Sequence, residues 1–138
     1  MENIQFDSGI RTYRINGDGI LRFHPGDPNV YARFMEGADK LRQVESSLAG
    51  LEAQQVLPAL QAADRQMKEI LGWIFGPGND FGEILGGVNL LAVAQNGERV
   101  VTNLFAALEP VLVAGAEACA GDAARAARQK AQARRAAQ

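Results

Sequence analysis

Side chains that bind metals or act as nucleophiles are scarce in this chain of 138 residues. It has one cysteine, Cys119, and one histidine, His24, which excludes an internal disulfide framework and a zinc site made of cysteine and histidine ligands. A catalytic Cys/His pair would need a thiolate, which the nearby carboxylates of Glu117 and Asp122 disfavour. We therefore expect a protein that is not an enzyme and that uses no metal and no cofactor.

A strong excess of charge of one sign is also missing. Basic residues number 14 and acidic residues 16, giving a net charge of −2, which argues against a domain built mainly to bind nucleic acid. Hydrophobic residues make up 47% of the chain and charged residues 22%, which is typical of a folded globular domain.

Long hydrophobic runs are absent as well. The most apolar stretch, residues 100–120, is interrupted by Asn103, Glu109, Pro110 and Glu117, which disfavours a membrane span. The first eight residues lack the basic and apolar segments of a secretory signal. We expect a soluble cytoplasmic protein.

Glycines cluster between residues 72 and 87, but without a nucleotide-binding pattern. Gly76, Gly78 and Gly82 have the wrong spacing for a dinucleotide fingerprint and follow a predicted helix, and no Gly-Lys-Ser/Thr sequence exists for a phosphate loop. These glycines predict consecutive helix ends.

Residues 3–25 predict a small β-hairpin or a three-stranded meander. Ile4 and Phe6 alternate with polar residues, and residues 11–15 alternate again before the turn signal Asn16-Gly17. Leu21 and Phe23 then supply the apolar face of a return strand.

Two helices are predicted to follow. The first is capped by Asp27-Pro28 and carries a heptad seam to Leu51. That seam either faces the core of the same chain or pairs with a helix of a partner. Its members are Val30, Phe34, Gly37, Leu41, Val44, Leu48 and Leu51. The second helix is predicted over residues 56–75, with Pro58 in its first turn. Its apolar face comprises Leu57, Leu60, Ala63, Met67, Ile70, Leu71 and Ile74.

The second half of the chain predicts shorter helices and then a long one. Asp80-Phe81-Gly82-Glu83 resembles a capping box for a short helical turn, and a helix is expected over residues 88–95. After Asn96-Gly97 comes a strongly apolar helix, which Pro110 is expected to kink or restart.

The last 17 residues differ in composition and form a basic tail. Residues 122–138 are largely alanine and carry a single acidic residue. We expect a protruding or frayed helix whose charges do not share one face, and therefore a solvated tail. Its basic residues are Arg125, Arg128, Lys130, Arg134 and Arg135. The predicted fold is mainly α, with antiparallel helices in one domain over residues 1–121 and this tail over residues 122–138.

Six apolar residues on the helices and around the glycines are candidates for partner binding. They belong either to the core or to a surface that contacts a partner, and the sequence alone does not separate the two. They are Phe34, Leu41, Phe75, Phe81, Ile84 and Leu85.

The order of these elements resembles the small tail assembly chaperones of siphophages and related prophages, particularly those of Gram-positive hosts. The resemblance covers roughly residues 15–138. It is carried by the Asp-Pro-capped helix, the glycine-rich stretch from Phe75-Gly76 through Phe81-Gly82 to Gly86-Gly87-Val88-Asn89-Leu90, and the Arg/Ala-rich tail. It implies a non-enzymatic protein of the host cytoplasm. Such a chaperone coats the tape measure protein, helps to recruit tail tube subunits, and is absent from the finished virion.

Three alternatives accompany this interpretation. The first is a small virion structural protein, such as a tail-completion or head–tail component, that forms a ring. The second is a regulator that binds nucleic acid through its basic tail, which the acidic body disfavours. An enzyme is the third. Self-association is expected in the chaperone interpretation as well.

Overall fold

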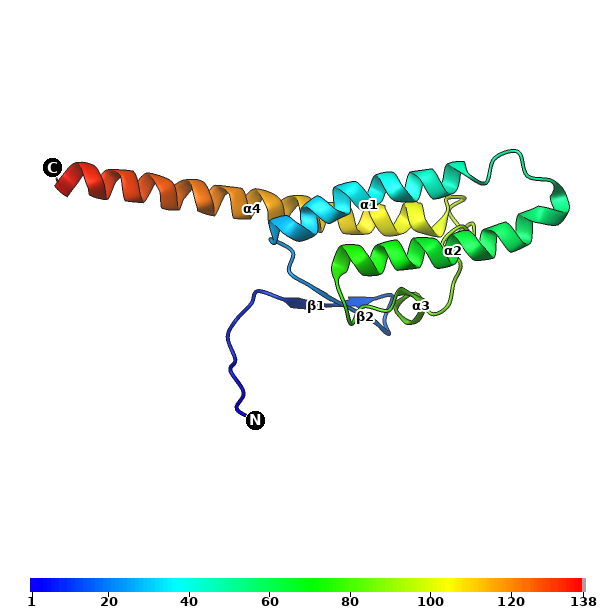
Figure 1. Cartoon of the computed structure of the whole chain (residues 1–138), viewed down its shortest axis with the longest axis horizontal. Helices are drawn as coiled ribbons and strands as arrows, with labels where there is room; N and C mark the ends of the chain where they lie inside the picture. The colour runs from blue at the N-terminus through cyan, green and yellow to red at the C-terminus, as the bar shows by residue number, and fades with distance from the viewer. Residues whose placement is uncertain (138) are drawn as a thin grey trace.

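A computed structural model describes residues 1–137 of the chain, except for the side chain of Ala137 (Figure 1). The predicted fold class is confirmed, because antiparallel helices dominate, a β-hairpin precedes them and a long C-terminal helix protrudes. The elements are β1 (Arg11–Ile15), β2 (Gly19–Phe23), α1 (Pro28–Ser46), α2 (Ala53–Phe75), α3 (Phe81–Ile84) and α4 (Val100–Ala137).

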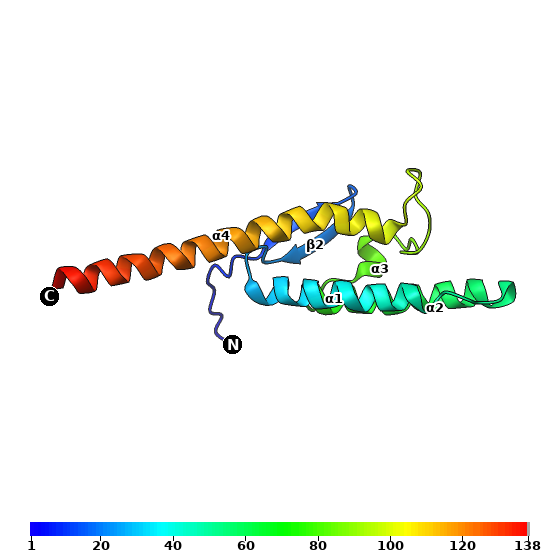
Figure 2. The ribbon, with the colours of Figure 1, turned by 90° about the horizontal axis from the view of Figure 1, so that it is seen from above.

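The helices and the hairpin form two layers. Helices α1 and α2 run antiparallel and pack against each other along one side of the molecule. The first half of α4 lies on the other side, together with the hairpin and α3 (Figure 2). Helix α4 runs antiparallel to α1, and its second half extends away from both layers.

The hairpin is shorter than the region for which strands were predicted. β1 pairs antiparallel with β2, with Tyr13 opposite Leu21, and the connecting turn places Asn16 at φ 49° and Gly17 at φ 94°. That turn confirms the Asn-Gly signal. The prediction of a strand around Ile4 and Phe6 is wrong, because residues 1–10 contain no strand and nothing in the described chain pairs with them.

Aromatic rings fix the hairpin to the end of α2. Tyr13 stacks on Phe23 with ring centroids 5.0 Å apart, and Phe23 meets Phe75 edge-on at 4.9 Å. Phe75 in turn lies 5.7 Å from Phe81 of α3. A two-stranded sheet is marginally stable alone, so this chain of rings supplies the packing that it needs.

The ends of α1 and α2 differ from the predicted ends. The Asp27 side chain accepts a hydrogen bond from the Asn29 amide at 2.9 Å, as the predicted N-cap requires. However, α1 ends at Ser46, because the chain tightens into turns there and then reverses at Gly50 (φ 76°). The last two seam positions, Leu48 and Leu51, therefore lie outside the helix.

Helix α2 begins at Ala53, three residues earlier than predicted, behind a capping box formed by Glu52 and Gln55. Pro58 consequently lies in the second turn rather than the first. Leu57, which was predicted on the apolar face, is 72% exposed.

The predicted helix over residues 88–95 is wrong, and side chains provide the reason. The Leu90 amide donates to Asp64 Oδ1 at 2.8 Å, and the Leu91 amide donates to Asn89 Oδ1 at 2.8 Å. These acceptors replace the backbone carbonyls that a helix would use. The segment instead folds back on the start of α4 through a bridge between Val93 and Arg99, and it buries Leu90 and Leu91.

Asp64 holds this segment on α2 together with Asn89, whose Nδ2 donates to the Leu60 carbonyl at 3.3 Å. Besides accepting from the Leu90 amide, Asp64 pairs with Lys68 at 2.9 Å, and its side chain is 14% exposed. We expect Asp64→Ala to lower the free energy of unfolding by about 1–3 kcal/mol, because the amide of Leu90 loses its acceptor in a buried setting. Asp64→Asn keeps an acceptor oxygen and should cost less. Urea unfolding followed by far-UV circular dichroism tests the difference, and equal losses in the two variants would contradict it.

Helix α4 runs without interruption from Val100 to Ala137, so of the kink or restart expected at Pro110 the restart does not occur. Proline has no amide hydrogen, so the carbonyl of Ala106 lacks the hydrogen bond that residue 110 would otherwise donate. Both residues lie on the exposed side of α4, where water can bond to this carbonyl. The same helix passes position 121, so the body and the basic tail share one continuous element. The tail is helical through Ala137.

Candidate partner-binding site

Most of the residues predicted to bind a partner lie in the hydrophobic core. Phe75, Phe81 and Ile84 are between 2% and 7% exposed, and they join α2, α3 and the hairpin. Leu85 packs half-buried against this cluster. A partner would reach these side chains only if the core opened, so this region serves the fold in the structure described.

Phe34 and Leu41 differ from the other predicted residues because they border an open groove. Both are buried, at 4% and 3% exposure, yet they line a groove of about 490 Å³ between α1 and α4. The ring of Phe34 packs against that of Phe105 with centroids 5.1 Å apart, which forms the apolar floor. The heptad seam thus faces the core of this chain and also reaches the edge of this groove.

The walls of the groove supply accessible apolar and small side chains. Met35 is 53% exposed, and Ala38 and Ala106 leave room for close approach of another backbone. Charged groups stand at the rim, where Arg42 also pairs with Asp39 at 2.9 Å. We call this site the α1–α4 groove. Its lining residues are Phe34, Met35, Ala38, Leu41, Arg42, Glu45, Val101, Thr102, Phe105, Ala106 and Glu109.

Two antiparallel helices with an apolar floor and a charged rim suit a third helix. An amphipathic helix buries its apolar face in such a groove and keeps its polar face in water. Met35, Phe105 and Ala106 were not predicted to bind a partner, because they lie beside the buried apolar faces of α1 and α4 rather than on them. Phe105 could have indicated this site, because it is a large aromatic residue next to Leu104 and Leu108, which lie on the core-facing side of the same helix.

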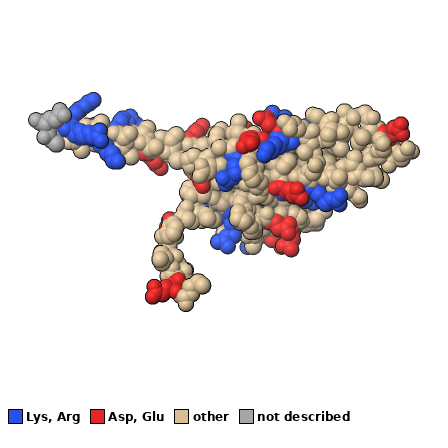
Figure 3. Space-filling model, in the orientation of Figure 1, with Lys and Arg blue, Asp and Glu red and all other residues tan. Residues whose placement is uncertain are grey.

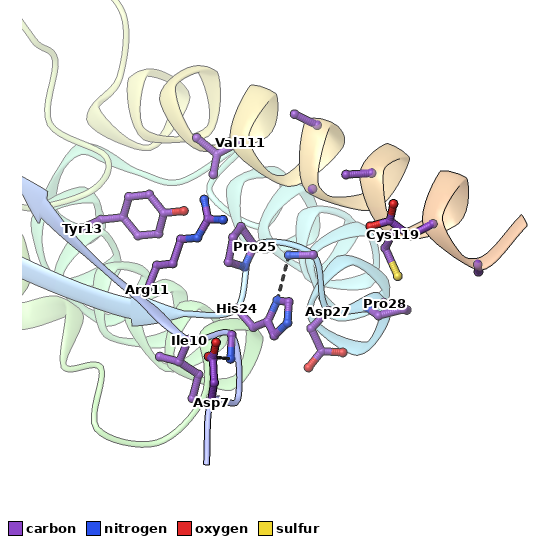
Figure 4. A pocket seen from close by; sticks show the side chains of 17 residues that line it. Asp7, Ile10, Arg11, Tyr13, His24, Pro25, Asp27, Pro28, Val111 and Cys119 are labelled. Atoms are coloured by element: carbon purple, nitrogen blue, oxygen red, sulfur yellow. Dashed lines mark hydrogen bonds between the residues drawn. The ribbon is translucent and has the colours of Figure 1, made fainter. Parts of the chain in front are cut away.

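A second, larger cleft contains the only cysteine and the only histidine (Figure 4). It measures about 1050 Å³ and lies between the start of β1, the loop before α1 and the middle of α4. His24 Nδ1 accepts a hydrogen bond from the Gly26 amide at 3.0 Å, which fixes the ring against the loop. Within residues 1–137, no hydrogen bond joins His24 to Cys119. Among those residues there is also no group of three or more potential metal ligands. The expectation of a non-enzyme stays a prediction.

Residues 122–136 of the basic tail lie on the protruding half of α4 and are exposed, whereas Gln138 lies outside the described residues (Figure 3). Arg125 forms an ion pair with Asp122. The helical positions of Arg125, Arg128, Lys130, Arg134 and Arg135 point in several directions around the axis, because successive residues turn by about 100°. A continuous basic stripe is therefore not formed.

Helix α4 also bears on the question of membranes. By length and composition, the helix over Val100–Ala136 is apolar enough to span a membrane. The same helix contributes Leu104, Leu108 and Leu112 to the core, as the core helix of a soluble protein does. Only 17% of its most apolar stretch of 18 residues is buried, however. The expectation of a soluble cytoplasmic protein stays a prediction.

Comparison of the chain with protein-family models, with curated proteins and with solved structures finds no match.

Proposed function

We propose that this protein is a phage tail assembly chaperone that binds the tape measure protein, keeps it soluble and helps to recruit tail tube subunits. The identity of the partners comes from the family resemblance of the sequence. The structural observation that supports it is the α1–α4 groove, which has the apolar floor and charged rim expected of a site for an amphipathic helix.

The chemistry of the client fits this groove. A tape measure protein is long and helical, and its apolar helix faces aggregate when they are exposed to water. Burying such a face in the α1–α4 groove removes apolar surface from water on both sides, which stabilises the complex. The rim charges of Arg42, Glu45 and Glu109 then select the register of the bound helix more than they add to its affinity.

Co-expression with a tape measure protein tests the proposal. We expect the wild-type protein to keep the client soluble and to co-purify with it in many copies. Met35→Glu places a charge in the wall of the groove, and we expect at least about tenfold weaker client binding, because the carboxylate must be desolvated there. Because Met35 is 53% exposed, the free protein should keep its melting temperature.

Leu57→Glu is the matched control. It makes the same kind of change at an exposed aliphatic position on α2, away from the groove. If both variants bind the client equally weakly, the added charge alone explains the loss, and the α1–α4 groove is not the binding site. If the client stays insoluble with the wild-type protein, the chaperone function itself is rejected.

The alternative function is a small virion structural protein that forms a ring. The observation that favours it is the pair of projections from the body, the extended N-terminal residues and the second half of α4, which could reach neighbouring subunits. The two functions differ in where the protein ends up. A ring component is found in purified particles at a fixed stoichiometry, whereas a chaperone is absent from them.

A further inference from the structure

The two edges of the hairpin differ in what covers them. On the β2 edge, the Arg22 amide donates to Asn79 Oδ1 at 2.9 Å, and Asn79 Nδ2 donates to the Arg22 carbonyl at 2.8 Å. Gly19 lies so close to the carbonyl of Ile84 that a β-carbon would overlap it. Asn79 and α3 therefore close the β2 edge, as Figure 1 shows for α3.

The β1 edge is open. Asn79 bonds to the backbone of Arg22 from outside the hairpin, so the amide and carbonyl of Arg22 point away from β1. Thr12 lies opposite Arg22, and residues opposite each other in an antiparallel pair point their backbone groups either both inward or both outward. The amides and carbonyls of Thr12, and of Arg14 two residues further on, therefore point away from β2. Within the described chain, none of these groups has a backbone partner outside the hairpin. Thr12 and Arg14 are both exposed. An open row of this kind is a template for another strand.

Residues 1–8, which we call the N-terminal arm, have the pattern of a strand without a sheet. Ile4 is 88% exposed and Phe6 81% exposed, and polar residues alternate with them. The arm extends away from both layers in Figures 1 and 2. Two large apolar side chains held in water are an unfavourable arrangement that burial against another surface relieves.

The arm and the hairpin carry opposite charges. Glu2 and Asp7 lie in the arm, which contains no lysine or arginine. The two strands carry Arg11, Arg14 and Arg22 and no acidic residue. This complementarity favours a hairpin of this same protein as the surface that the arm meets.

The local backbone directs the arm away from its own hairpin. Gly9 has φ 79° and lies against the ring of His24, so closely that a β-carbon would overlap the ring. The Gly9 amide donates to Asp7 Oδ1 at 2.8 Å, which fixes the turn at which the arm departs. A second molecule, rather than a fold-back within the chain, is thus the partner that the geometry favours.

We propose that the N-terminal arm of one molecule adds as a third strand to the open β1 edge of a second copy. Reciprocal exchange of two arms about a twofold axis satisfies both edges and closes a dimer. The inference does not rest on the chaperone function, because it concerns the purified protein without any client.

Sedimentation equilibrium of the purified full chain tests the exchange. We expect a dimer whose dissociation constant rises at least about tenfold in Phe6→Asp, because the aspartate cannot replace the buried aromatic ring. The matched control is Val93→Asp, which places the same charge at a position that is 69% exposed and distant in sequence from the arm and the hairpin. It should leave the constant unchanged.

A second pair of variants separates the two halves of the contact. Thr12→Pro removes an outward amide without removing a β1–β2 hydrogen bond, and a truncated chain that lacks residues 1–8 removes the arm. Each should be monomeric alone. Mixed together they should form a heterodimer, because one supplies an arm and the other an intact edge.

Three results would overturn the proposal. The first is a wild-type chain that sediments as a monomer at about 100 μM, which is about 100-fold above a micromolar dissociation constant. The second is a dimer that neither the truncation nor Phe6→Asp weakens. The third is hydrogen exchange that shows the arm protected in a monomer, which would place it on its own hairpin. Circular dichroism of each variant checks that the fold persists.

Discussion

Replacing Leu71 with alanine is expected to lower the free energy of unfolding by about 2–5 kcal/mol. Leu71 lies on α2 and is fully buried at 0% exposure, within the same core as Met67 and Ile74. Shortening it removes apolar contacts and leaves a cavity that the surrounding side chains fill only in part. Urea unfolding measured by circular dichroism and by fluorescence of Trp73, the only tryptophan, gives the change.

Leu57→Ala is the control for this experiment. It makes the same substitution on the same helix, but Leu57 is 72% exposed, so the expected change is within about 0.5 kcal/mol. Both leucines belong to the apolar face that the sequence predicts for α2, and only the structure separates them. Equal losses in the two variants would mean that the buried face of α2 is assigned incorrectly.

The second large effect concerns two glycines of α4 that should respond to alanine in opposite directions. Gly115 lies directly against the carbonyl group of Pro25, and a β-carbon there would overlap that backbone. The contact is between two backbones, so no flexible side chain can move aside. We expect Gly115→Ala to destabilise the protein by about 1–3 kcal/mol, because α4 must shift away from the loop that precedes α1.

Gly121 has open space where its β-carbon would stand and lies within the same helix. Gly121→Ala should therefore stabilise the helix by about 0.5–1 kcal/mol, the usual benefit of alanine over glycine. Thermal unfolding of both variants tests the contrast. Stabilisation of both would show that α4 does not approach Pro25 as described.

The sequence predicts most of the fold where local signals and tertiary packing agree. Asp27-Pro28, Asn16-Gly17 and the apolar periodicity of α2 identify their elements, because each signal acts through neighbouring residues. The segment from Leu85 to Arg99 could not be predicted in this way. Its conformation depends on Asp64, which lies on another helix and competes for the backbone amide of Leu90.

The candidate site could be predicted only in part for a related reason. Phe34 and Leu41 stand out by their heptad spacing, but the groove exists because α4 crosses beside α1, and no local pattern specifies that crossing. The sequence does not decide whether Phe75, Phe81 and Ile84 lie in the core or on a partner-binding surface. The rings of Phe75, Phe81 and Phe23 pack together across α2, α3 and the hairpin, and this contact between distant segments places the cluster in the core.

The uneven support along α4 has a consequence for how this helix forms. Its buried residues end at Leu112, Gly115 still lies against the carbonyl of Pro25, and residues 122–136 are exposed and rich in alanine. Starting a helix is costly, whereas adding residues to an existing one is nearly neutral for alanine. The docked half of α4 therefore acts as a permanent nucleus for the exposed half. We expect the exposed turns of α4 to melt at a lower temperature than the body, because no packing holds them beyond the docked turns.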